Sequence, residues 1–208
     1  MATTILLVRH GQTEWNRVER FRGRADVPLN DTGLQQAEVT GRRIAAKWQP
    51  KAVYSSPLPR AVKTAEAIAE NFNLPVVVHP GLADIDYGEW QDVTTEEALK
   101  RWPEMVDAWF DTPHLVRIPG GETLDALRVR AMKAVDELAA RHAGQIIVLV
   151  GHTVINRIIL LGVLGLKNER FWHIRQEPCA INVFEVDAGD YTLVSLNDIC
   201  HLSNLDPL

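Results

Sequence analysis

Two residues with complementary chemistry, Arg9 and His10, stand together at the end of an apolar run, Thr4 to Val8. A short run of branched apolar residues predicts a buried strand, and Gly11 would let the chain turn where the strand stops. Ligands of open α/β sheets bind beyond the carboxyl ends of strands. Arg offers a planar fork for phosphate oxygens, and a neutral His can act as a nucleophile. The pair predicts an anion-binding site at this edge; a surface His in an ordinary loop is the alternative.

A second histidine follows the same pattern. The apolar run Gln145 to Val150 predicts another buried strand, and it leads directly to Gly151-His152-Thr153. Two strands of one sheet would therefore deliver imidazoles to the same edge.

A third short strand, Ala52 to Tyr54, leads through Ser55-Ser56-Pro57 to Arg60 near the start of a helix. Backbone amides at a helix N-terminus also favour anions. We therefore expect four side chains to surround one tetrahedral anion, with an amide from Asn16 close by. The four are Arg9, His10, Arg60 and His152.

Metal binding is the alternative for the two histidines. Zinc would need a third ligand, which Asp84 or Asp86 could supply, and a second shell that accepts from each ring. Two arginines beside the site would repel a cation, so we expect neither a metal nor another cofactor.

Composition narrows the class of protein. The 208 residues are 46% hydrophobic and 24% charged, which is typical of one soluble domain spanning 1–208. The net charge of −5, with no Lys/Arg-rich run, argues against nucleic-acid partners. Cys179 and Cys200 lack metal-binding spacing and suit a reduced, cytoplasmic protein.

Membrane partners are not expected either. The first residues do not resemble a signal peptide, and the longest apolar run, Ile158 to Leu166, is too short to span a bilayer. The apolar helix predicted at Ile158 to Leu164 would form either core or the face of a homodimer, and the sequence leaves both open.

Predicted strands and helices alternate along the chain. Helices are expected at Thr32–Trp48, Leu58–Asn71, Thr123–His142 and from Thr153 to about Leu164, with a further strand at Val76–Val78. Ile181 to Val186 and Tyr191 to Leu196 flank a Gly-containing turn and predict a hairpin. The order favours a single three-layer α/β/α domain with a mostly parallel central sheet.

The stretch 85–121 differs from its surroundings. It carries Trp90, Trp102 and Trp109, several acids and three prolines, without a strong strand pattern. We interpret it as a mostly helical insertion that covers the sheet edge and closes on a substrate. A surface subdomain anchored by its tryptophans is the alternative.

Six motifs occur in an order that resembles the histidine phosphatase superfamily, also called phosphoglycerate mutase-like. They are Arg9-His10-Gly11-Gln12-Thr13 with Asn16, Pro28-Leu29-Asn30 with Gly33, Ser55-Ser56 with Arg60 and Thr64, Asp84 to Trp90, Gly120-Gly121-Glu122, and Gly151-His152-Thr153. The resemblance covers nearly the whole chain.

The resemblance implies covalent catalysis without a metal. By position, His10 corresponds to the nucleophile that becomes phosphohistidine, and Arg9, Arg60 and His152, assisted by Asn16, to the phosphate pocket. The acid position carries Asp84, where the family usually has Glu. A carboxylic acid must protonate the leaving alkoxide and then, as carboxylate, deprotonate the attacking water. Asp86 or Glu89 is the alternative donor, because Asp84 has the shorter side chain.

Further positions concern the substrate. Thr153 follows the second histidine and is expected to contact substrate. Arg22 replaces a frequent Gln and suggests a second anionic group on the substrate. The tail, Asn197 to Leu202, resembles the metal-independent phosphoserine phosphatases, whose tail helps form the pocket; His201 is the candidate there. Those enzymes carry a histidine where this chain has Tyr87.

The resemblance favours hydrolysis of a small phosphorylated metabolite over mutase chemistry. Phosphoglycerate mutases of this superfamily have a longer insertion between the acid and the second histidine, which excludes water from the intermediate. That longer insertion is missing between Asp84 and His152. A phosphoglycerate mutase and a noncatalytic phosphate-binding module are the alternatives, although both His10 and the acid are present.

Overall fold

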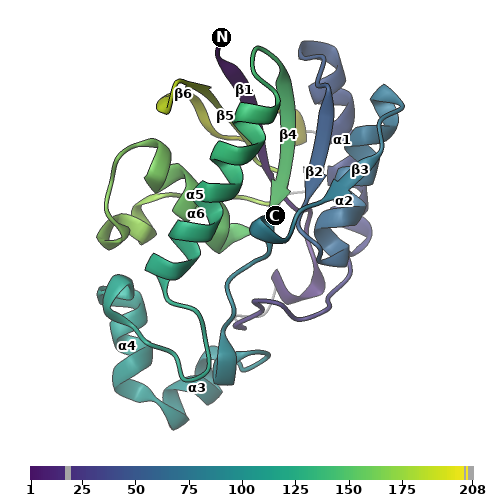
Figure 1. Cartoon of the computed structure of the whole chain (residues 1–208). Helices are drawn as coiled ribbons and strands as arrows, with labels where there is room; N and C mark the ends of the chain where they lie inside the picture. The colour runs from purple at the N-terminus through teal and green to yellow at the C-terminus, as the bar shows by residue number, and fades with distance from the viewer. Residues whose placement is uncertain (17–19, 204, 206–208) are drawn as a thin grey trace.

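In the described part of the chain, six strands form one sheet in the order β3-β2-β4-β1-β5-β6, as the computed structural model shows (Figure 1). Their bounds are β1 Thr3–Arg9, β2 Ala52–Ser55, β3 Val76–Val78, β4 Ile146–Gly151, β5 Ile181–Asp187 and β6 Asp190–Asp198. The structure describes residues 1–16, 20–203 and 205, and only the main chain of residue 16. The pairs from β3 to β1 are parallel, whereas β5 and β6 pair antiparallel. The sheet is mixed, with its parallel half where the motifs lie.

Strand register brings the predicted site motifs together. Arg9 at the end of β1 pairs with Gly151 at the end of β4, and Ser55 at the end of β2 pairs with Val150. These central strands are buried almost throughout, which explains their apolar sequences. The residues that follow each strand therefore meet at one edge of the sheet.

Helices cover both faces of the sheet, which confirms the predicted three layers (Figure 1). One face carries α1 (Asp31–Lys47) and α2 (Pro59–Ala69), and the other carries α5 (Leu124–Arg141) and α6 (Thr153–Val163). In α6, residues 158 to 161 are fully buried, so this apolar helix forms part of the core of the chain. Among the described residues, no helix combines the length and the apolar character that crossing a membrane would require.

Gly11 has a different role from the one expected. Its φ is not positive, so no sharp left-handed turn demands a glycine there. A Cβ on Gly11 would instead lie 2.4 Å from the carbonyl oxygen of Gly33, and one on Gly33 would lie 2.0 Å from that of Gln12. Two backbones touch at this point, at the start of α1, where the Asn30 side chain caps the helix by accepting from Gly33 N–H.

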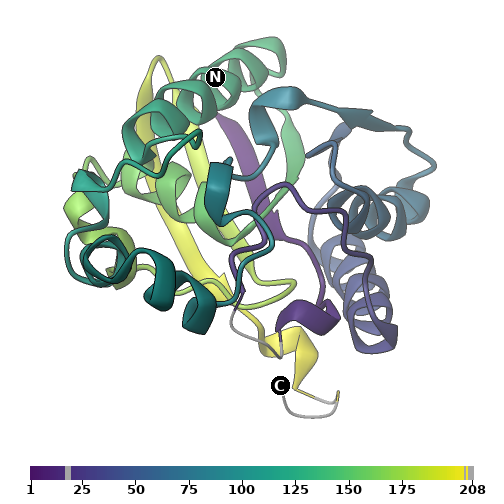
Figure 2. The same cartoon turned by 90° about the horizontal axis from the view of Figure 1, so that it is seen from below.

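The segment 85–121 is helical, as predicted, with α3 (Thr95–Arg101) and α4 (Pro103–Asp111) joined to short 3-10 turns. Figures 1 and 2 place these helices beyond the carboxyl edge of the parallel strands, on the side of the sheet that α5 and α6 cover. Trp90 is fully buried, and its ring lies 6.2 Å from that of Trp102 and 6.4 Å from that of Trp109. The tryptophans thus give the insertion its own packed centre.

Candidate active site

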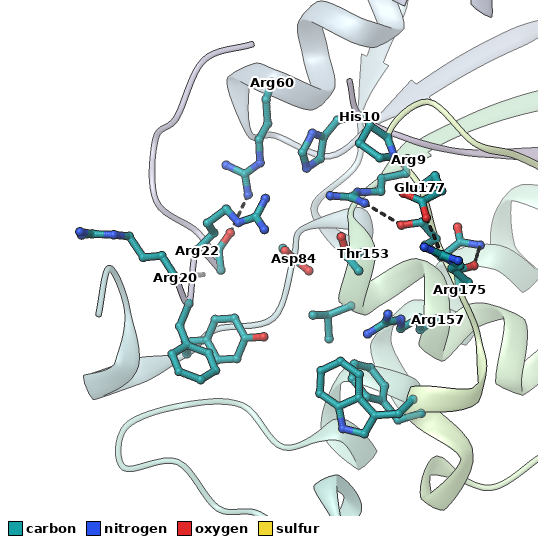
Figure 3. Close-up of a pocket in the computed structure, with 18 of the residues that line it drawn as sticks. Arg9, His10, Arg20, Arg22, Arg60, Asp84, Thr153, Arg157, Arg175 and Glu177 are labelled. Atoms are coloured by element: carbon teal, nitrogen blue, oxygen red, sulfur yellow. Dashed lines mark hydrogen bonds and ion pairs between the residues drawn. The ribbon is translucent and has the colours of Figure 1, made fainter. Parts of the chain in front are cut away.

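A cavity of about 820 Å³ opens at the carboxyl edge of the parallel strands (Figure 3). Among the described residues, six arginines line it, with two carboxylates, Asp84 and Glu177. The arginines are Arg9, Arg20, Arg22, Arg60, Arg157 and Arg175. Although the net charge of the chain is −5, the cavity is strongly positive and suits an anionic ligand.

His10 lines this cavity and is 2% exposed. Its Nδ1 lies 2.6 Å from the carbonyl oxygen of Gly11, and because a carbonyl can only accept, Nδ1 carries the proton. In the neutral ring, the lone pair therefore belongs to Nε2. Burial, followed by the neighbouring His152, Arg60 and Arg9, holds the pKa of His10 well below its usual value. The ring is thus kept neutral and nucleophilic at neutral pH.

His152 lies beside His10, with ring centroids 5.0 Å apart, but it is fully buried behind that residue and is not among the residues that line the cavity. Its Nε2 lies 2.7 Å from Ser56 Oγ, while its buried Nδ1 has no partner within the described residues. Burial and then Arg60 lower its pKa as well. A buried imidazole nitrogen beside the nucleophile can donate a hydrogen bond to a bound phosphoryl group.

Arg9 and Arg60 are fixed by main-chain carbonyls rather than by carboxylates. Arg9 donates to the carbonyl of Gln176 at 2.6 Å, and Arg60 donates to those of Ala25 and Gly23 at 2.6 and 2.7 Å. In both, the buried Nε has no partner among the described groups. Burial lowers the pKa of Arg9 to about 9, so it stays cationic at neutral pH. Neither charge is neutralised by an ion pair in the described part of the chain, which leaves both available to an anion.

The N-terminus of α6 adds to this positive region. His152 is the N-cap residue and makes no side-chain cap bond, and Thr153 and Val154 of the first turn line the cavity. Their main-chain amides have no carbonyl partner within the helix, and the helix dipole favours negative charge there. We call Arg9, His10, Arg60, His152 and this helix start the phosphate end.

Asp84 is the acid beside the phosphate end, as predicted by register. It is 6% exposed and lines the cavity, and its Oδ1 has no hydrogen-bond partner among the described residues. Burial raises the pKa of Asp84, although the Arg60 guanidinium opposes this shift. A carboxyl group with a raised pKa can hold a proton for a leaving group.

The two alternative acids are placed less favourably. Asp86 forms an ion pair with Arg24 at 3.1 Å and accepts from Gly88 N–H at 2.9 Å. Neither Asp86 nor Glu89 is among the residues that line the cavity. The geometry therefore favours Asp84 over both.

Arg130 of α5 holds the loop that carries Asp84, and the sequence analysis missed it. Its guanidinium donates to the carbonyls of Gly81, Ala83 and Asp84 at 3.1, 2.8 and 2.9 Å. It also forms a two-pronged ion pair with Glu122, at 2.7 and 2.9 Å. The acidic residue of the Gly120-Gly121-Glu122 motif thus serves to orient Arg130, which in turn fixes the acid loop.

The predicted substrate residues divide into two groups. Arg22, Tyr87 and Thr153 line the cavity, and Arg22 lies beside Asp84 and Arg60 at the phosphate end (Figure 3). The side chain of Asn16 lies outside the described residues.

His201 does not contribute to the cavity lining, which corrects the expectation for the tail. Its Nε2 lies 2.9 Å from Thr40 Oγ1 of α1, and the 3-10 turn Cys200–Leu202 packs against that helix. The tail therefore holds His201 against α1 rather than in the lining of the cavity.

The wall opposite the phosphate end is aromatic. Tyr87, Trp109, Phe171 and Trp172 line it, with ring centroids of neighbouring pairs 4.9 to 6.1 Å apart. We call these four residues the aromatic wall. Arg157 lies against it, one turn of α6 beyond Thr153. Its spacing of four from Thr153 could have placed it on the same helix face from sequence alone.

Among the described residues, no group of three or more His, Cys, Asp or Glu side chains is arranged to hold a metal ion. The residues at the phosphate end are instead donors and cations, which suit an anion.

Comparison with known proteins identifies the family. The model of the histidine phosphatase superfamily (branch 1) matches residues 5–199. The chain belongs to the histidine phosphatase superfamily. A protein named phosphoserine phosphatase 1 from Hydrogenobacter thermophilus is 33% identical over 95% of this chain and 93% of its own length. A metal-independent phosphoserine phosphatase from Arabidopsis thaliana is 33% identical over 98% of this chain and 84% of its own.

Solved structures agree with this assignment. The Bacillus stearothermophilus protein YhfR superposes with a TM-score of 0.91 at 29% identity, covering 96% of this chain and 99% of that one. The predicted fold class and family are confirmed, and the chain is a phosphatase of this superfamily.

Proposed function

We propose that this phosphatase hydrolyses phosphate monoesters of small metabolites, with phosphoserine as the first candidate, through a phosphohistidine on His10. The observation that carries the proposal is the Nδ1–H bond from His10 to the Gly11 carbonyl, which leaves Nε2 with its lone pair in a cavity rich in arginine. The relatives named phosphoserine phosphatase support the choice of substrate.

In the first step, Nε2 of His10 attacks phosphorus and the bond from phosphorus to the ester oxygen breaks. The charge on the transferring phosphoryl group is stabilised by Arg9, Arg60 and the amides at the start of α6. Asp84, whose pKa burial raises, gives its proton to the departing alkoxide.

In the second step, the Asp84 carboxylate takes a proton from water, which attacks phosphorus and breaks the P–N bond. Inorganic phosphate leaves, and His10 and Asp84 return to their starting protonation states. Asp84 thus acts first as the acid and then as the base, whereas His10 acts first as the nucleophile and then as the leaving group.

The test is phosphate release from phosphoserine, 3-phosphoglycerate and sugar phosphates in excess EDTA, with rapid quench of radiolabelled substrate into alkaline detergent, which preserves a P–N bond, to trap phosphoenzyme. We expect turnover that survives EDTA, alkali-stable and acid-labile label on the protein, and loss of both in His10→Ala. His173→Ala, which removes an exposed histidine outside the cavity, is the matched control and should behave as the parent.

Other outcomes would overturn the proposal. Activity abolished by EDTA would indicate a metal mechanism. Turnover retained in His10→Ala would remove the phosphohistidine route, and phosphoryl exchange between phosphoglycerates without net release would indicate a mutase.

A further inference from the structure

Arg157 occupies a position in the cavity that the reaction steps above do not use. It projects from α6 on the same face as Thr153, four residues earlier, and points into the cavity (Figure 3). Its Nε donates to the carbonyl of Ile174 at 2.7 Å, and its guanidinium carbon lies 5.1 and 4.8 Å from the ring centroids of Phe171 and Trp172. The Nε edge of the guanidinium is thus fixed, and Arg157 is one of the residues that line the cavity.

The charge of Arg157 has no counterion within the described residues. By contrast, Arg20 pairs with Asp92 at 2.6 Å, and Arg175 pairs with Glu177 at 2.6 Å. Glu177 is the nearest carboxylate that influences Arg157, but it is already engaged by Arg175. A half-buried cation beside aromatic rings loses hydration without gaining an ion pair, which is unfavourable unless a ligand supplies the anion.

The position also separates Arg157 from the phosphate. Because an α-helix rises about 1.5 Å per residue, the Cα atom of Arg157 lies about 6 Å further along α6 than that of Thr153. The electrostatic neighbours of Arg60 are Asp84, Arg22 and Asp26, whereas those of Arg157 are Tyr87 and Glu177. Arg9 is influenced by both Arg22 and Arg157, so the cationic lining runs from Arg22 through Arg9 to Arg157, which lies at its end against the aromatic wall.

We propose that Arg157 binds a carboxylate on the alcohol part of the substrate and selects phosphate esters of small hydroxy acids. The planar guanidinium can donate two parallel hydrogen bonds to a carboxylate, and Phe171 and Trp172 exclude water from that pair. The inference rests on the proposed function, because it names the residue that recognises the leaving group of that reaction. It moves this role from Arg22, the residue suggested by sequence, which lies beside Asp84 and Arg60.

The test compares phosphoserine with phosphoethanolamine, which differs only in lacking the carboxylate. We expect the parent enzyme to prefer phosphoserine in kcat/KM by at least tenfold. Arg157→Met should lower kcat/KM for phosphoserine by roughly 10- to 100-fold, mainly through KM, but for phosphoethanolamine by less than about threefold. Arg157→Lys keeps the charge without the fork and should recover only part of the preference.

Arg20→Met is the matched control. It also removes one guanidinium at the cavity, but one whose charge Asp92 already balances, and the preference for phosphoserine should persist. A purely structural role for Arg157 would lower the rates with both substrates equally, and that result would overturn the proposal. A parent enzyme without preference for phosphoserine would do the same.

Failure of the proposed function would be visible separately. Phosphoserine and phosphoethanolamine binding to His10→Ala, measured by calorimetry, reports on Arg157 without any turnover. If Arg157→Met in that background weakens phosphoserine binding alone, the carboxylate contact stands even where hydrolysis fails. Equal weakening of both ligands, or of neither, contradicts it.

Discussion

The phosphate end and the aromatic wall face one cavity but are built in different ways. His10, His152 and Arg9 stand at the ends of paired parallel strands, whose register fixes them relative to one another. The aromatic wall comes from α4 and from segments on either side of it in the chain, and ring contacts hold it together. Residues on one sheet are held in fixed positions, which suits the binding of the phosphoryl group that every substrate carries. The aromatic wall is built from other segments, so its residues can change to fit a different alcohol without disturbing the phosphate end.

Substitution of Asp84, which lies between the two regions, should have the largest effect on the rate of hydrolysis. Asp84→Asn should lower kcat for phosphoserine by about 10²–10⁴-fold, since the leaving alkoxide needs a proton. Because the leaving group of p-nitrophenyl phosphate is weakly basic and needs no proton, the rate at which this substrate phosphorylates the enzyme should fall far less. Rapid-quench measurement of both substrates checks this, and equal losses would assign Asp84 a structural role.

The Asp84→Asn variant should also differ from the parent in how kcat depends on pH. Burial raises the pKa of Asp84, and the required proton is therefore present at low pH and lost as the pH rises through that raised pKa. The pKa of His10 is held low, so the nucleophile stays neutral across this range. The alkaline decline of kcat for phosphoserine should disappear in Asp84→Asn. Its persistence would assign the decline to another group.

Arg130→Met should have the next largest effect, because it frees the acid loop without touching the cavity. We expect kcat for phosphoserine to fall by about 10- to 100-fold through misplacement of Asp84, with a much smaller loss for p-nitrophenyl phosphate. Lys133→Met, an exposed residue of the same helix, is the control and should change neither. Uniform losses with both substrates would point to general destabilisation, which a thermal melt would register.

Arg22→Gln should have the smallest effect on catalysis, and it tests whether the phosphate end and the aromatic wall bind different parts of the substrate. Because Arg22 lies with Arg60 and Asp84, its loss should raise KM for phosphoserine and phosphoethanolamine alike, by roughly 3- to 10-fold. Arg157→Met is expected to discriminate between them. If Arg22→Gln affected phosphoserine alone, the carboxylate would belong at Arg22 and the two regions would exchange roles.

The sequence by itself determined the phosphate end. Apolar runs precede His10 and His152, and a turn precedes Arg60, which predicts strands that end at one edge of the sheet. The register of β1, β2 and β4 confirms that these three strands end at the same edge. Local signals also placed most elements well; Thr123, for example, caps α5 by accepting from Ala126 N–H. Such features depend on residues close in the chain, which periodicity and capping rules describe.

Only the tertiary structure decided which distant side chains meet. Arg130 contacts the Asp84 loop, although the two residues are 46 positions apart in the chain. Arg157 lies against the rings of Phe171 and Trp172, which belong to a separate segment. His201, expected in the pocket, lies against Thr40 because the tail packs on α1. Gly11 is required by the close approach of Gly33 rather than by its own φ. These outcomes depend on packing between segments far apart in sequence, and a single sequence does not encode that packing in any local pattern.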